Sequence, residues 1–183
     1  LFHLVGGFVY AQVLQACVRL RLFDLLAGGP RELALLARAM ALPPERAERL
    51  LQAAAALQLV QPRAGGRWGL GPLGAVMAGH RGLAAMVEHH AMLYADLADP
   101  VALLRDGGAA TRLARFWPYA DGDASGHLGE AEVAPYSALM AASQPLVAEQ
   151  VLDAVRLDGH RCLLDVGGGD GAFLAAVASR APG

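Results

Sequence analysis

A glycine-rich stretch near the C-terminal end, residues 163–171, constrains the fold of this chain more than any other part of the sequence. An apolar run interrupted by Asp165 ends at Val166, and glycine fills four of the five positions 167–171. Residues 172–179 then follow a helical pattern. Glycines permit tight turns and a close approach of a ligand to the backbone, and a helix start offers free N–H groups. The stretch therefore predicts a strand, a loop and a helix that together bind a nucleotide.

Two ligand patterns overlap in this loop. Gly167-x-Gly169-x-x-Ala172 matches the dinucleotide pattern of NAD sites, whereas Asp165-x-Gly167-x-Gly169-x-Gly171 matches the acidic-first pattern of S-adenosylmethionine sites. The acid favours the second pattern, because a carboxylate attracts the ammonium of that ligand and repels a pyrophosphate. The ligand's own carboxylate would face the loop amides.

The first 80 residues have the pattern of a small helical domain. Apolar residues three and four apart predict one long helix over residues 8–26, with more apolar surface than a single neighbour would cover. Helices follow over residues 32–40 and, after a proline turn, as far as Leu57. Two short runs on either side of a glycine-containing turn, 59–61 and 68–70, predict a hairpin. This order of helix, turn, helix and hairpin is that of a winged helix.

A winged helix leaves two uses open. Residues 1–80 carry 8 Arg and 4 acidic residues, and this basic half keeps a DNA-binding regulator with a ligand domain as an alternative. In the second helix of the pair, however, Arg46 and Arg49 alternate with Glu45 and Glu48, which cancels the positive field that a phosphate backbone requires. We therefore expect the domain to hold two subunits together, with no nucleic acid as partner.

Further helices are predicted in the second half of the chain, over residues 82–97, 101–104, 111–117 and 136–155, the last of them opened by Pro135. The first of these helices carries two adjacent histidines, His89 and His90. Neighbouring side chains on a helix point about 100° apart, so the pair is not expected to share a metal ion.

Residues 121–132 match the twelve-residue calcium loop. Oxygen ligands stand at its first, third and fifth positions, Gly126 at the sixth and Glu132 at the twelfth. Such loops join two regular helices and usually work in pairs, whereas Pro118 and Pro135 flank this one and no second copy of the pattern exists in the sequence. A calcium-binding module is therefore kept as an alternative to a surface loop that binds no metal.

Composition indicates a cytoplasmic protein. Cys17 and Cys162 are too few for a disulfide framework and fit a reducing cytosol. No apolar run approaches the roughly 18 residues of a membrane-spanning helix, and no signal peptide is visible. Because the chain begins at Leu1 and stops soon after the glycine loop, we expect it to be a piece of a longer protein.

The whole chain resembles the small-molecule O-methyltransferases of the plant caffeate and bacterial acetylserotonin type. The run 163–171 resembles their first methyltransferase motif. Four further segments are similar to the carotenoid branch, the hydroxyneurosporene or demethylspheroidene O-methyltransferases of purple photosynthetic bacteria: 8–24, 85–100, 114–119 and 135–145. The resemblance implies a mainly α-helical chain, with a winged-helix-like dimerisation domain over 1–80. A helical linker and substrate-pocket region would occupy 81–155, and the truncated start of a Rossmann-like α/β domain 156–183.

The resemblance also implies a binding site and a reaction. Asp165, Gly167, Gly168, Gly169 and Gly171 would bind S-adenosylmethionine, and Tyr136, Met140 and Ser143 would lie beside the donor and the acceptor. The expected acceptor is a hydroxylated, apolar molecule, in a homodimer that could lie at the periphery of a photosynthetic membrane. The catalytic histidine of the family is expected beyond residue 183, so no catalytic residue is assigned and the fragment alone is expected to be inactive.

Overall fold

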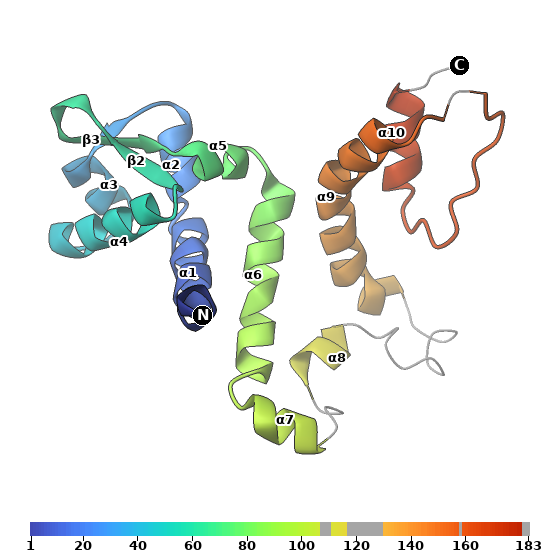
Figure 1. Ribbon diagram of the computed structural model, residues 1–183, viewed down its shortest axis with the longest axis horizontal. Coiled ribbons are helices and arrows are strands. Elements are labelled where there is room, and N and C mark those ends of the chain that lie inside the picture. The colour runs from blue at the N-terminus through green and yellow to red at the C-terminus, as the bar shows by residue number, and fades with distance from the viewer. Residues whose placement is uncertain (107–110, 117–129, 158, 181–183) are drawn as a thin grey trace. The chain divides into compact units, whose positions relative to one another are not determined.

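The computed structural model describes residues 1–106, 111–116, 130–157 and 159–180 (Figure 1). The chain divides into two compact units, Leu1–Glu88 and His89–Gly183. Most described residues of both units are helical, as predicted.

The first unit combines five helices with a small sheet. The helices are α1 (Phe2–Arg19), α2 (Leu22–Ala27), α3 (Leu33–Ala39), α4 (Pro44–Ala56) and α5 (Pro72–Met77), and the strands are β1 (Arg31–Glu32), β2 (Val60–Arg63) and β3 (Arg67–Leu70). The antiparallel sheet has the order β1-β3-β2, with Val60 opposite Leu70 and Arg63 opposite Arg67. The predicted hairpin is confirmed. The third strand β1 and helix α5 were not predicted.

The long helix predicted over residues 8–26 is wrong, because the chain breaks between α1 and α2. Arg21 has a left-handed backbone conformation with φ of 55°, which ends the regular helix. The N–H groups of Leu20 and Arg21 donate to carbonyl groups of the last turn of α1. The break redirects the chain so that Leu22 and Leu26 of α2 enter the core, where both are almost completely buried.

The core of the first unit lies between its helices and the sheet. Helix α4 begins at Pro44, where proline's fixed φ suits a first helical position. It buries Ala47, Leu51 and Ala54, which lie three and four residues apart on one face. These side chains pack in one cluster with residues of α1, α2, α3 and β2.

Helix α6 (Arg81–Asp96) begins in the first unit and ends in the second. The second unit also contains α7 (Pro100–Asp106), α8 (Arg112–Phe116), α9 (Glu130–Ala154) and α10 (Ala172–Arg180). The prediction that Pro135 opens the long helix is wrong, because α9 already begins at Glu130.

Two aspartates fix the starts of short helices in this unit. Asp99 Oδ1 accepts hydrogen bonds from the N–H groups of Val101 and Ala102 in the first turn of α7. Asp96, at the end of α6, accepts 3.0 and 2.8 Å hydrogen bonds from the N–H groups of Arg112 and Leu113. Because the first N–H groups of a helix have no partner within it, these carboxylates cap α7 and α8.

The strand predicted just before the glycine loop is absent. Residues 162–165 run without regular secondary structure, and Leu164 and Val166 are 82% and 87% exposed. A strand requires hydrogen bonds to a neighbouring strand, and the sheet in the described part of the chain belongs wholly to the first unit. The predicted β-α unit is therefore present as its loop and helix only.

Two sequence-based expectations concern ions and membranes. The calcium pattern, residues 121–132, lies almost entirely outside the described residues. Within the described residues, no group of three potential ligand side chains is placed to hold a metal ion. Among the described helices, none is both long enough and apolar enough to cross a membrane.

Candidate functional site

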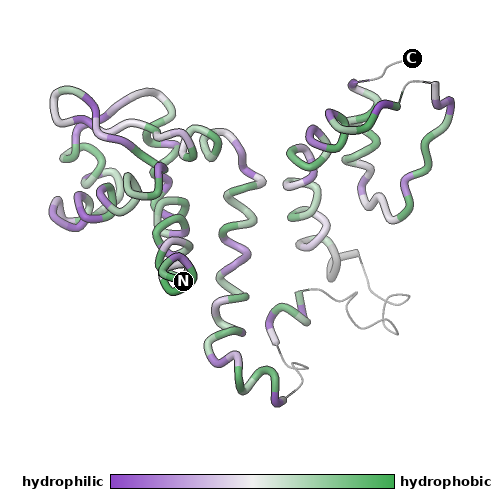
Figure 2. Tube along the Cα trace, viewed as in Figure 1, coloured by the Kyte–Doolittle hydropathy of each residue, from purple (hydrophilic) through white to green (hydrophobic). Residues whose placement is uncertain are grey.

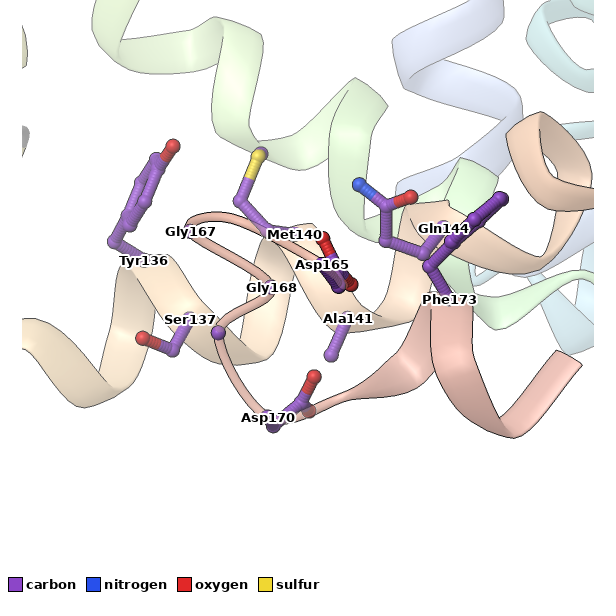
Figure 3. A pocket seen from close by; sticks show the side chains of 11 residues that line it. Tyr136, Ser137, Met140, Ala141, Gln144, Asp165, Gly167, Gly168, Asp170 and Phe173 are labelled. Carbon is purple, nitrogen blue, oxygen red and sulfur yellow. The ribbon is translucent and has the colours of Figure 1, made fainter. Parts of the chain in front are cut away.

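A cavity of about 310 Å³ lies between α9, the glycine loop and the start of α10 in the second unit (Figure 3). Helix α9 contributes Tyr136, Ser137, Met140, Ala141 and Gln144; the loop contributes Asp165, Gly167, Gly168, Gly169 and Asp170; α10 contributes Phe173. The volume is at the lower end of the range typical for small-molecule sites, about 300–1,000 Å³.

The wall from α9 follows directly from helical spacing. Tyr136, Met140 and Gln144 are four residues apart, so their side chains lie along one side of the helix, as Figure 3 shows. Ser137 and Ala141 form a second, smaller row. The wall thus offers an aromatic ring, a thioether and an amide to a bound molecule.

The loop wall is built around the carboxylate of Asp165. Its Oδ2 atom is buried and has no hydrogen-bond partner among the described residues. A Cβ atom at Gly168 would lie 2.4 Å from this oxygen, closer than real Cβ contacts, so a side chain there would require the loop or the carboxylate to shift. Gly169 has a backbone φ of +58°, a conformation that residues other than glycine rarely adopt.

The start of α10 closes the cavity. The N–H group of Gly171 donates to the carbonyl of Gly168 at 2.9 Å, which completes the turn into the helix. Asp170 Oδ1 accepts a 3.3 Å hydrogen bond from the N–H group of Ala172. Phe173 then places its ring at the cavity within the first turn.

Helix α10 is held against α9 along its length. The two helices pack together, and Arg180 in the last turn of α10 forms an ion pair with Asp153 near the end of α9. Because α9 forms one wall of the cavity and α10 follows directly from the loop that forms the other, the spacing of the two walls depends on this packing.

Six of the eight residues predicted for the site line one cavity, and two do not. Tyr136, Met140, Asp165, Gly167, Gly168 and Gly169 line it. Gly171 stands outside the lining at the turn into α10, and Ser143 Oγ donates a 2.9 Å hydrogen bond to the carbonyl of Met140. The ligand contacts of all eight stay predictions.

Gln144 and Phe173 line the cavity but are not among the residues predicted from the sequence. The spacing of four residues from Tyr136 through Met140 leads to Gln144 rather than to Ser143, and this signal was present in the sequence. Phe173 could have been placed from its position in the first turn after the loop. Asp170 also lines the cavity, and no residue pattern in the sequence predicted its position there.

A second cavity of about 410 Å³ lies among the ends of α6, α7 and α8. It is lined mainly by leucines, with Asp96 and Thr111 as its polar members: Leu93, Asp96, Leu97, Leu103, Leu104, Thr111 and Leu113. Hydrogen bonds from the Arg112 and Leu113 N–H groups hold the pKa of Asp96 below its usual range. Because the carboxylate is already bonded to α8, its role there is structural.

Comparison with known protein families identifies two domains in the chain. A model described as the O-methyltransferase dimerisation domain matches residues 2–79, and one described as the O-methyltransferase domain matches residues 94–183. Together they match nearly the whole chain. The chain belongs to the O-methyltransferase family. The resemblance inferred from the sequence is thereby confirmed.

Two curated members of the O-methyltransferase family are close relatives. The chain is 52% identical over 182 residues to a demethylspheroidene O-methyltransferase of Cereibacter sphaeroides. The match covers 100% of this chain and 48% of the relative. It is 49% identical over 183 residues to the enzyme of the same name from Rhodobacter capsulatus, covering 100% of this chain and 46% of the relative. The chain therefore spans about half the length of the curated relatives it matches.

A solved structure also matches across both units. The crystal structure of N,N-8-amino-8-demethyl-D-riboflavin dimethyltransferase from Streptomyces davawensis is 30% identical, with a TM-score of 0.68. The match covers 99% of this chain and 55% of that one. The O-methyltransferase chain described here thus corresponds to about half of a known methyltransferase structure.

Proposed function

We propose that the intact protein, meaning the whole product of the gene that encodes these 183 residues, transfers a methyl group from S-adenosylmethionine to a hydroxyl group of an apolar molecule. Its acceptor class is the hydroxylated carotenoids. The observation that carries the proposal is the cavity beside the glycine loop, which Asp165 lines. One oxygen of the Asp165 carboxylate is buried and has no hydrogen-bond partner among the described residues.

The residues of the cavity fit this donor. S-adenosylmethionine carries an ammonium and a sulfonium, and a buried carboxylate oxygen without a partner is stabilised by such charges. Gly168 keeps side chains away from that oxygen. Asp165, with Gly167, Gly168, Gly169 and Gly171, would hold the donor against the loop, and Phe173 would supply an aromatic surface for its planar base.

These residues would contribute to the reaction mainly by positioning the donor and the acceptor, because the methyl group of the donor is already activated. When bound, the donor supplies an already activated methyl group, which moves from sulfur to the acceptor oxygen in one displacement. The cavity walls would fix the donor and exclude water, and Tyr136 and Met140 would face the reacting side. The hydroxyl proton must pass to a base, which the family resemblance assigns to a histidine beyond residue 183.

The first unit is proposed to form a homodimer through α1. Figure 2 colours much of this helix near the N-terminus as hydrophobic. Its exposed side chains include Phe2 at 90%, Leu4 at 81% and Val5 at 73%. A contiguous apolar surface of this kind marks an interface, and the matching family model is that of a dimerisation domain.

The finer fold assignments are also part of the proposal. The order α3, α4 and the hairpin β2–β3, with β1 added to the sheet, supports a winged-helix-like first unit. The loop and α10 support the start of a Rossmann-like domain, with the region 81–155 as linker and substrate pocket. A cytoplasmic location, at the edge of a photosynthetic membrane where carotenoids reside, follows from the proposed acceptor.

The alternatives are less well supported. Both family models that match are those of O-methyltransferases, whereas a DNA-binding regulator would have to use a helix in which Arg and Glu alternate. The calcium-binding module depends on residues outside the described part of the chain.

The decisive experiment supplies the purified intact protein with methyl-labelled S-adenosylmethionine. Hydroxylated carotenoids and, for comparison, hydroxylated phenolics serve as acceptors. We expect label in the carotenoid ether and its loss when the acceptor lacks a hydroxyl. Transfer to phenolics alone would contradict the acceptor class, and the absence of transfer to either would contradict the function.

A further inference from the structure

We propose that His89, Phe116 and Tyr136 form an aromatic row that binds a flat, unsaturated acceptor next to the donor cavity. This inference rests on the proposed function and assigns to it a specificity surface that extends from the cavity wall at Tyr136. The three side chains come from α6, α8 and α9, and all belong to the second unit.

The rings of the row lie within interaction distance of one another. The ring centroids of His89 and Phe116 are 4.7 Å apart with an angle of 42° between the rings, and those of Phe116 and Tyr136 are 6.3 Å apart in an edge-to-face arrangement. Both spacings fall in the range of favourable aromatic pairs, about 4.5–7 Å. The contacts continue along α6 from His89 to His90 and then to Tyr94.

Tyr136 connects this row to the donor cavity, because it belongs to both. A molecule that lies along the row therefore has one end at the cavity wall where the methyl group would be delivered. The extent of the row suits an elongated acceptor better than a compact one.

The row is not part of the buried core. Among the described residues of the second unit, the buried apolar side chains are Leu139 and Ala148, whereas all three rings of the row remain partly accessible. Aromatic rings that remain accessible beside a cavity can gain contact area when a ligand binds.

The row is also uncharged. Burial, and secondarily the neighbouring His90, hold the pKa of His89 below its usual value, which favours the neutral form of its ring. His89 Nδ1 is shielded from solvent and has no hydrogen-bond partner among the described residues. A neutral series of rings favours a molecule that is apolar along its length over a charged one.

Two substitutions in the intact protein test the row. We expect Phe116→Ala and His89→Ala each to raise the acceptor KM about tenfold, because each removes ring contacts along the acceptor. The dissociation constant of S-adenosylmethionine should stay within twofold of the wild type. Phe116→Tyr and His89→Phe retain the rings and should restore the acceptor KM. Val101→Ala is the matched control, since Val101 is 52% exposed on α7 outside the row.

A measurement on the wild-type protein tests the row without relying on variants that could fail to fold. Hydrogen exchange of the intact protein with S-adenosylhomocysteine, with and without a hydroxylated polyene, should show slower exchange in residues 112–116 and 89–94 when the polyene is present. An unchanged acceptor KM in both alanine variants, or no protection in either segment, would overturn the proposal that the row binds the acceptor. A wild type that transfers no methyl group would instead contradict the proposed function.

Discussion

The carboxylate of Asp165 occupies the space that a side chain at position 168 would need: a Cβ atom on Gly168 would lie 2.4 Å from Asp165 Oδ2. The same oxygen has no hydrogen-bond partner among the described residues. Glycine at 168 thus leaves room beneath the loop for the carboxylate of Asp165, a residue that lines the cavity. The two residues form a unit, one supplying charge and the other supplying room.

Replacing the charge tests the first half of this relationship. Asp165→Asn removes the negative charge while keeping the shape, so we expect the intact protein to bind S-adenosylmethionine about 10- to 100-fold more weakly, as for the loss of a hydrogen bond to a charged group. Folding should change little, because Oδ2 bonds to no described residue. Equilibrium dialysis gives the affinity. Asp24→Asn, which alters an exposed ion pair with Arg21, should leave it unchanged.

The two cysteines should differ in reactivity. Burial raises the pKa of the Cys17 thiol to about 12, and its side chain is 0% exposed, whereas Cys162 is exposed. The reactive thiolate fraction of Cys17 at pH 8 is on the order of 10⁻⁴. We expect iodoacetamide to alkylate Cys162 in the native protein and Cys17 only after denaturation, as read by peptide mass spectrometry. Equal alkylation rates in the native protein would contradict the packing of α1.

The start of α8 should depend on Asp96. In Asp96→Ala, the amides of Arg112 and Leu113 lose their acceptors and should exchange hydrogen faster. Because these bonds lower the pKa of Asp96, the wild-type protection should be complete above the ordinary carboxyl pKa and lost as the pH falls through the lowered one.

A matched variant checks that the effect is local. Asp99→Ala should speed exchange at Val101 and Ala102 and leave residues 112–113 unchanged, because Asp99 caps α7. If both substitutions affected both helices equally, the separate capping roles would be wrong.

The core of the first unit should respond strongly to loss of volume. Leu51 is 0% exposed on α4, and Leu51→Ala should lower the free energy of unfolding by about 2–5 kcal/mol. Leu35→Ala should cost less than about 0.5 kcal/mol, because Leu35 is 55% exposed. Hydrogen exchange of the α4 amides measures both. Similar decreases of the free energy of unfolding in the two variants would contradict the burial of Leu51 in the core.

Local patterns predicted the parts of the fold that depend on local chemistry. The proline at position 44 and the spacing of Ala47, Leu51 and Ala54 placed α4, and the turn between two short apolar runs placed the hairpin. Periodicity failed at Arg21, since apolar residues continue through the break and only the left-handed backbone at that residue ends α1. A two-residue strand such as β1 has no period to detect.

Part of the cavity lining could be predicted from the sequence. The spacing of Asp165 and the glycines predicted a loop that does line the cavity, and the period of four residues along α9 could have added Gln144. The packing of α10 against α9, which brings Phe173 to the cavity, joins segments far apart in sequence and had no local signal. The strand expected before the loop depended on a neighbour that the described residues do not supply.

We propose that the loop over Asp165 holds the methyl donor, and calorimetric titration of the intact protein with S-adenosylmethionine measures this binding. Gly168→Ala requires the loop or the Asp165 carboxylate to shift from its place, so we expect at least about a tenfold loss of donor affinity. Gly28→Ala is the matched control, because open space surrounds a Cβ there and its φ is −81°. Equal affinity of wild type, Gly168→Ala and Gly28→Ala would show that the loop over Asp165 does not hold the donor.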